Sequence, residues 1–187
     1  MTKEEIINEL IATKCDPRNH RNRLYRLVEN GKHNVRELLE LSFEKKDYFS
    51  FRAGRVLEFI CKKSLDPIVP HLDYFTQNIS MVAHHSTRRE MAKICELIAI
   101  NYNKKETSLL KSCITQKQKD MIVEACFYWM ISDEKVAIHA YSMQILFILG
   151  KENNWIHTEL KQILVDNIAF GSKGYVVRAK KILQAIG

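Results

Sequence analysis

Glycine and proline are scarce in this sequence, since only 6 Gly and 3 Pro occur among its 187 residues. Tight turns depend on these two residue types, so a protein built of many short strands would need more of them. Long helices suit the scarcity, because glycine and proline are the residues that interrupt them. With 46% hydrophobic and 27% charged residues, the composition favours an all-helical protein of ordinary soluble type.

The cysteines form no metal-binding or redox pattern. Five of them are widely spaced with no Cys-x-x-Cys pair: Cys15, Cys61, Cys95, Cys113 and Cys126. We expect them to be reduced and mostly buried. His71, His84 and His85 have no acidic or cysteine partner at ligand spacing, and no glycine-rich phosphate loop or nucleophile motif occurs. The sequence therefore predicts no metal, no cofactor and no catalytic residue.

Long hydrophobic runs are absent as well. The longest ones, Ala125–Ile131 and Ile145–Leu149, fall far short of the roughly 20 residues that span a bilayer. The first residues, Met-Thr-Lys-Glu-Glu, lead into an amphipathic pattern instead of the apolar core of a signal peptide. We expect a cytoplasmic protein without a membrane partner.

Apolar residues recur at three- and four-residue spacing along almost the whole chain, which is the period of a helix. Capping residues mark the helix starts, with Thr2 before Glu5 and Thr115 before Gln118 at capping-box spacing. Asp66 before Pro67 is a further candidate cap. The predicted helices cover residues 3–14, 17–30, 34–45, 48–63, 67–79, 86–102, 106–113, 116–131, 133–150, 154–170 and 175–186. We place Trp129 and Trp155 on apolar stripes and expect both in the core.

A local pattern repeats along the chain. Phe51-Arg52-Ala53-Gly54-Arg55-Val56-Leu57 aligns with Val177-Arg178-Ala179-Lys180-Lys181-Ile182-Leu183. Looser copies begin at Arg89 and His139, so that residues 52, 89, 139 and 178 are 37, 50 and 39 residues apart. These offsets bracket a period of about 40–47 residues, in which each helical hairpin buries its apolar face only against its neighbours.

These segments resemble small bacterial HEAT-repeat proteins. The likeness rests on Phe51 to Leu72, on Phe127-Tyr128-Trp129 with Asp133-Glu134-Lys135-Val136-Ala137, and on the closing Arg178-Ala179. It covers about residues 48–187, whereas residues 1–45 match less well and are interpreted as capping helices. The resemblance implies a right-handed α-α superhelix of stacked antiparallel hairpins over a single domain, residues 1–187, without assigned chemistry.

In such stacks the second helix of each hairpin lines the concave face. The residues that we predict on this face are Arg52, Arg55, Arg88, Arg89, Lys93, His139, Arg178 and Lys181. As a binding site they would contact an extended ligand. Alternatively, the arginines form ladders with acidic residues of adjacent repeats or lie over apolar surface.

The favoured function is a non-catalytic scaffold whose concave face holds a protein segment or another extended ligand. A net charge of +7 keeps nucleic acid as the alternative partner, in a DNA-binding protein that resembles the HEAT-like alkylpurine DNA glycosylases. The catalytic aromatic and aspartate positions of those enzymes have no match here. The sequence does not indicate the oligomeric state or the identity of the partner.

Overall fold

The structure is a computed structural model that describes residues 2–15, 20–44 and 47–187, with side chains over residues 2–12, 26–44 and 49–187. Every regular element in these residues is a helix, so the predicted all-α class is confirmed. The chain divides into two compact units, residues 1–94 and 95–187, and the division falls inside one long helix, α6. The predicted single domain with capping helices over 1–45 stays a prediction. No helix among the described residues is long and apolar enough to cross a membrane.

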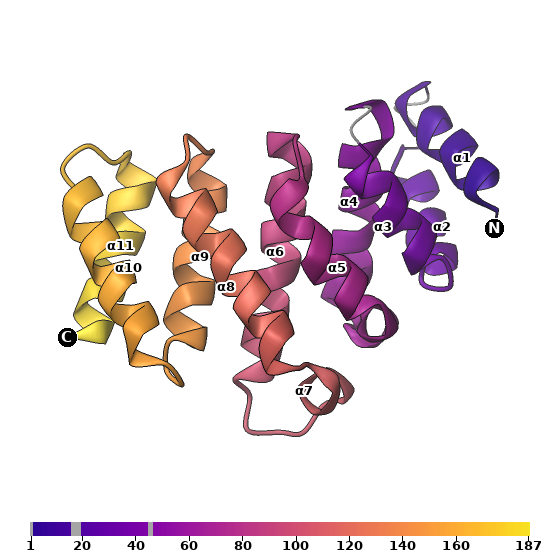
Figure 1. The fold of residues 1–187 in the computed structure, drawn as a ribbon. Coiled ribbons are helices and arrows are strands. Elements are labelled where there is room, and N and C mark those ends of the chain that lie inside the picture. The colour runs from indigo at the N-terminus through magenta and orange to yellow at the C-terminus, as the bar shows by residue number, and fades with distance from the viewer. Residues whose placement is uncertain (1, 16–19, 45–46) are drawn as a thin grey trace. The chain divides into compact units, whose positions relative to one another are not determined.

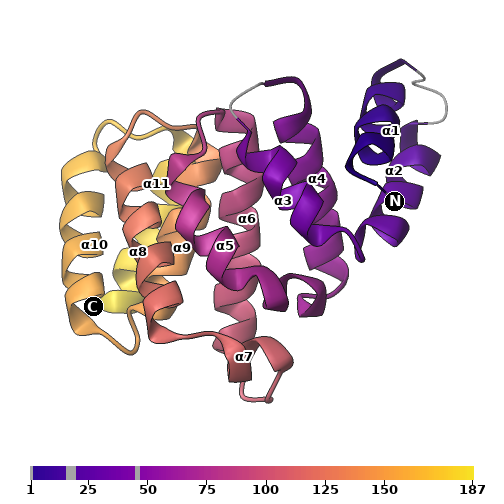
Figure 2. The ribbon, with the colours of Figure 1, turned by 45° about the vertical axis from the view of Figure 1, so that its right-hand side comes forward.

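The first unit consists of helical pairs that pack on the central helix α4 (Figures 1 and 2). Its elements are α1 (Lys3–Cys15), α2 (His20–Gly31), α3 (Val35–Phe43), α4 (Asp47–Lys63), the 3-10 helix η1 (Asp66–His71), α5 (Leu72–Asn78), the 3-10 turn η2 (Ile79–Met81) and the start of α6 (His85–Tyr102). Thr2 and Glu5 form the predicted capping box, because each accepts a hydrogen bond from the backbone N–H of the other.

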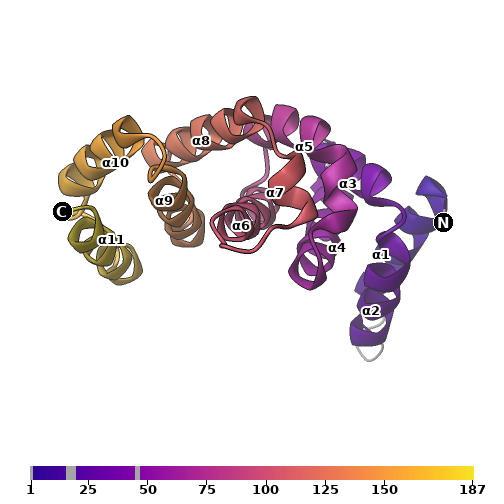
Figure 3. The same ribbon diagram turned by 90° about the horizontal axis from the view of Figure 1, so that it is seen from below.

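The second unit contains the end of α6 and two long antiparallel hairpins. Its further helices are α7 (Leu109–Cys113), α8 (Gln116–Ile131), α9 (Val136–Leu149), α10 (Asn154–Asn167) and α11 (Lys173–Ile186). Figure 3 shows the first helices of the two hairpins, α8 and α10, in one layer and the second helices, α9 and α11, in the other. Thr115 and Gln118 form a complete capping box at the start of α8, as predicted.

Close packing between α4 and α6 explains a glycine inside a helix. A Cβ atom added to Gly54 would lie 3.1 Å from Cε of Met91 and 3.5 Å from Cγ2 of Thr87. One turn away, the hydroxyls of Ser50 and Thr87 are hydrogen-bonded at 3.1 Å. Since these two residues are 37 positions apart, adjacent copies of the repeated pattern lie in register in this unit.

The structure differs from the predicted helices at several places. The helices predicted over 106–113 and 154–170 are shorter, and span Leu109–Cys113 and Asn154–Asn167. The helix predicted over 67–79 is split into η1 and α5, because Pro70 lies inside and a proline interior to an α-helix removes a hydrogen bond. Asp66 is not the N-cap of η1, since Leu65 holds that position. The backbone N–H of Asp66 instead donates to the Ser64 hydroxyl. The helix predicted from residue 133 begins at Val136.

Candidate binding surfaces

One face of α4 carries alternating aromatic and cationic side chains. Phe51, Arg55, Phe59 and Lys62 follow one another at spacings of four, four and three residues, which place them on one side of a helix. The Arg55 guanidinium lies 5.4 Å from the centre of the Phe59 ring, and the Lys62 ammonium lies 5.3 Å from it. Both distances are typical of cation–π contacts. We call these four residues the α4 ridge.

Two buried carboxyl groups hold the cations of the α4 ridge. Arg55 donates a hydrogen bond of 3.1 Å to Oε1 of Glu90, and Lys62 lies 2.5 Å from Oε1 of Glu58. The side chains of Arg55 and Lys62 are each 42% exposed, whereas those of Glu58 and Glu90 are 2% exposed. The cations therefore have fixed positions and still face solvent, so a ligand would need to order little of this surface.

The pKa values of the two carboxyl groups are shifted in opposite directions. Burial raises the pKa of Glu90 to about 7, and the hydrogen bond and charge of Glu58 act in the same direction. Burial also disfavours ionised Glu58, but the hydrogen bond from Glu90 and the ion pair with Lys62 outweigh it and leave the pKa of Glu58 lowered. Because like charges this close resist joint ionisation, Glu58 is the charged member and Glu90 holds the proton below neutral pH.

The other cations predicted in the first unit mostly contact groups of the same unit. Arg52 donates to the Leu10 carbonyl at 2.6 Å, and Arg88 donates to the Val82 carbonyl at 2.6 Å. Arg89 donates to Oε1 of Glu90 at 2.7 Å, beside Arg55. Lys93 is half-buried on α6. Arg55 and Arg89 thus converge on the carboxyl group of Glu90, which is the ladder-like arrangement considered as the alternative above.

The predicted residues of the second unit lie on its second helices, α9 and α11. Arg178 donates to the side-chain carbonyl of Gln144 at 3.0 Å and so links the two helices. The His139 ring stacks edge-on against Tyr175 at 5.7 Å, with Nε2 lying 3.2 Å from the Ser132 carbonyl. Lys181 is exposed. The assignment of all eight residues to one concave face remains a prediction.

Sequence reasoning missed the aromatic half of the α4 ridge and its buried carboxyl groups. The signal was present, because Phe51, Arg55 and Phe59 recur every four residues. Trp155 is a second error, since it is 57% exposed and stacks on the Phe127 ring at 5.8 Å instead of lying in the core. Trp129 is fully buried, as predicted.

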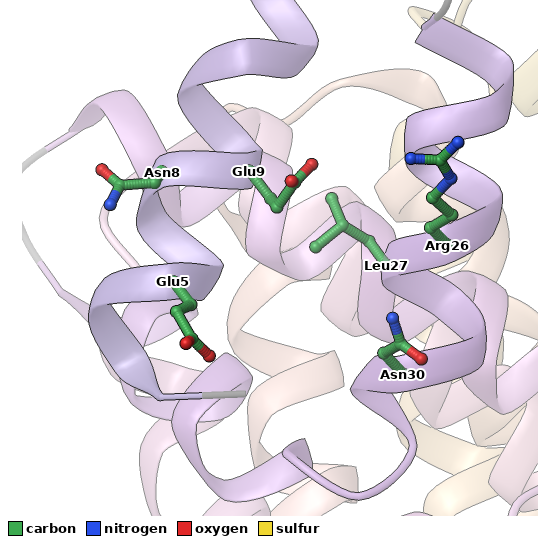
Figure 4. Close-up of a pocket in the computed structure, with 6 residues that line it drawn as sticks. All are labelled: Glu5, Asn8, Glu9, Arg26, Leu27 and Asn30. Atoms are coloured by element: carbon green, nitrogen blue, oxygen red, sulfur yellow. The ribbon is translucent and has the colours of Figure 1, made fainter.

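A hollow of about 360 Å³ lies between α1 and α2 (Figure 4). Glu5, Asn8 and Glu9 line it from α1, and Arg26, Leu27 and Asn30 line it from α2. Figure 4 shows the Glu9 side chain directed toward Leu27 across the hollow. The Glu5 carboxylate is already used by the helix cap. No group of three or more potential metal ligands occurs among the described residues.

The chain matches the family model described as a HEAT repeat domain over residues 7–186. The match spans both compact units and includes the α4 ridge. No curated protein and no solved structure matches the chain significantly.

Proposed function

The chain belongs to the HEAT-repeat family, a family of helical-repeat scaffolds, and from this premise we propose that it is a non-catalytic scaffold holding an extended protein segment. The observation that carries the proposal is the α4 ridge, an exposed row of aromatic and cationic side chains with fixed positions. Stacked repeats of this type create extended concave surfaces that bind ligands.

The chemistry of the α4 ridge indicates the class of segment. Arg55 and Lys62 attract carboxylates, and the rings of Phe51 and Phe59 offer apolar contact beside them. An acidic segment with interspersed apolar residues satisfies both features. Arg89 and Lys93 on α6, Arg52 and Arg88 in the same unit, and His139, Arg178 and Lys181 in the second unit are the residues that would extend this contact in the proposed concave face.

A photo-crosslinking experiment tests the proposal. We would replace Phe51, which is 40% exposed, with p-benzoylphenylalanine, an aromatic crosslinker of similar shape, and irradiate cells of the native organism. Met81 in the same unit is 65% exposed but lies outside the α4 ridge, so Met81→p-benzoylphenylalanine is the matched control. We expect protein adducts at position 51 that are absent at position 81. The adducts should decline when Arg55→Gln and Lys62→Gln are added.

Adducts that survive both cation substitutions, or that form equally at position 81, would contradict the proposal. The nucleic-acid alternative has its own readout, which is the affinity for duplex DNA as a function of salt. Phosphate contacts made by Arg55 and Lys62 would give a steep loss of affinity with rising salt, and the two glutamine substitutions would flatten the slope by about 2.

A further inference from the structure

The second unit contains a groove that is separate from all of these cations except His139. Its volume is about 580 Å³, and it lies where the α8–α9 turn meets the α10–α11 loop. The lining residues are Met130, Ile131, Ser132, Asp133, Glu134, Val136, His139, Asn167, Phe170, Gly171, Ser172 and Tyr175. All of them belong to residues 95–187, so the groove is complete within one compact unit.

Apolar side chains form the rim of this groove and are unusually exposed. Ile131 is 72% exposed, Phe170 is 89% exposed and Val136 is 41% exposed. Single exposed apolar residues are common on protein surfaces, but a cluster around a concavity marks an interaction site. The rim therefore provides anchoring contacts for a large apolar side chain.

A buried hydroxyl group belongs to one of the residues that line the groove. Tyr175 is 95% buried, yet its hydroxyl has no hydrogen-bond partner among the described residues. An unsatisfied buried hydroxyl costs free energy, so a native structure that keeps one calls for an explanation. A ligand in the groove would supply the missing partner if the side chains that cover this hydroxyl move aside when the ligand binds.

The charge of the groove is opposite to that of the chain. Asp133 and Glu134 line it, and no Lys or Arg does, although the chain as a whole has a net charge of +7. The start of α9 explains a carboxylate at this point through the helix dipole. The helix dipole explains neither the apolar rim nor the Tyr175 hydroxyl. The acidic side chains, the apolar rim and the buried hydroxyl together therefore require another explanation.

We propose that this groove binds a segment of a partner protein in which a large apolar side chain stands next to a lysine or arginine. The apolar side chain lies against Ile131 and Phe170, and the cation faces the exposed Asp133, next to the buried Glu134. A groove of about 580 Å³ has the size of a pocket that holds a few side chains. A stable dimer, in contrast, buries a surface of about 800 Å² on each partner. The groove thus suits a peptide segment better than a second copy of this chain.

Selection from a phage-displayed random-peptide library against the intact chain tests the proposal. We expect enrichment of peptides that carry Lys or Arg beside Leu, Ile, Met, Phe or Trp. The affinities of labelled synthetic copies of these peptides are then measured by fluorescence anisotropy. Ile131→Ser should weaken binding about tenfold, because it removes an apolar contact. Val177→Ser is the matched control, since Val177 in the same unit is 71% exposed but lies outside the groove.

Two more variants separate charge and hydrogen bonding from packing. Asp133→Lys should weaken the same peptides about tenfold, whereas the exposed Glu124→Lys on α8 should leave affinity within about twofold. Tyr175→Phe should weaken binding about fivefold without lowering the thermal midpoint of the free protein. A purely structural tyrosine would change the midpoint and leave affinity intact.

Each opposite result would overturn the proposal. In the selection, these results are enrichment of acidic peptides, or no enrichment beyond that obtained with the Ile131→Ser protein. In the anisotropy measurement, the result is an equal loss of peptide affinity in Ile131→Ser and Val177→Ser. Sedimentation velocity supplies one more such result. If the protein is a dimer and Ile131→Ser dissociates it, the groove is occupied by a second copy of the chain. Arg55→Gln tests independence, since it should weaken capture at the α4 ridge and leave peptide binding in the groove unchanged.

Discussion

Glu90→Gln is expected to change how the stability of the first unit depends on pH. Glu90 is 1% exposed and accepts hydrogen bonds from Arg55 and Arg89. Glutamine has nearly the same shape as a protonated glutamate and keeps a carbonyl oxygen for these donors. The substitution therefore mimics the protonated state of Glu90 at every pH.

The sign follows from the raised pKa. In the unfolded chain the Glu90 carboxyl ionises near its ordinary value of 4.5, whereas in the folded protein its pKa is about 7. The folded state thus binds more protons at this site, and stability falls as pH rises between these values. From about pH 5 to about pH 8 the loss amounts to about 2–3 kcal/mol. The stabilisation that Glu90 contributes should be fully present below pH 4.5. Glu58 makes the opposite contribution at more acidic pH, because its pKa is lowered.

Urea unfolding of both proteins at several pH values between about 5 and about 8 measures this effect. Far-UV circular dichroism follows the helices of both units, whereas tryptophan fluorescence reports only on the second, since Trp129 and Trp155 both lie there. Relative to wild type, Glu90→Gln should gain about 2–3 kcal/mol across this range in the dichroism signal. Contributions of other groups, such as the lowered pKa of His71, cancel in the difference.

Parallel stability curves for wild type and Glu90→Gln would refute this reasoning. They would mean that the Glu90 carboxyl is ionised throughout, held by the two arginines, and that burial is not the dominant influence on its pKa. The exposed Glu124→Gln serves as the control for removal of one negative charge and should leave the slope unchanged.

Three further predictions concern packing and thiol chemistry. Lys119→Met should destabilise the second unit by about 1–2 kcal/mol in urea unfolding, since Lys119 donates to Tyr102 at 2.7 Å and to Glu152 at 2.8 Å. The lowered pKa of Glu152 means that this contribution is present above 4.5 and declines as pH falls, and Lys119→Arg should retain part of it. Gly54→Leu should cost about 1–3 kcal/mol through overpacking against Met91, while a thermal midpoint equal to wild type would contradict the close approach of α4 and α6. In a Cys15→Ser protein, a thiol reagent should label the exposed Cys113 quickly and Cys61 only after unfolding. Cys61 should react slowly because it is buried, and burial raises its pKa to about 12. Fast labelling of Cys61 would contradict this expectation and show that the site around it opens.

The sequence predicted most of the fold because helical periodicity and capping are local. The starts of α1 and α8 follow from Thr2 with Glu5 and from Thr115 with Gln118, and both boxes form. Errors arise where the local signal is ambiguous. Asp66 before Pro67 has the composition of a cap, but Pro70 shortens the segment and the chain adopts a 3-10 helix there. Trp155 satisfies the apolar spacing but lies at the exposed start of α10, where periodicity alone does not decide burial.

The candidate sites were less predictable, because they depend on contacts between residues far apart in the chain. Glu58 and Glu90 have no motif that links them, yet α4 and α6 bring their carboxyl groups together. The groove in the second unit likewise combines Ile131 with Phe170 of the α10–α11 loop and with Tyr175 of α11. Such pairs become visible only once helix packing is known, whereas the row Phe51, Arg55, Phe59 and Lys62 was readable from spacing.

The two proposed surfaces differ in the sign of their charge, and this difference bears on how a scaffold of net charge +7 selects its partners. The α4 ridge presents Arg55 and Lys62 beside aromatic rings, whereas the groove presents Asp133 and Glu134 beside exposed apolar side chains. On these two proposals, a strongly acidic segment would gain affinity at the α4 ridge and be repelled by the groove, and a basic segment would experience the reverse. Discrimination therefore needs no catalytic group and no cofactor. It requires only that each unit keep its charged side chains in place, which in the first unit is the role of the buried carboxyl pair Glu58 and Glu90.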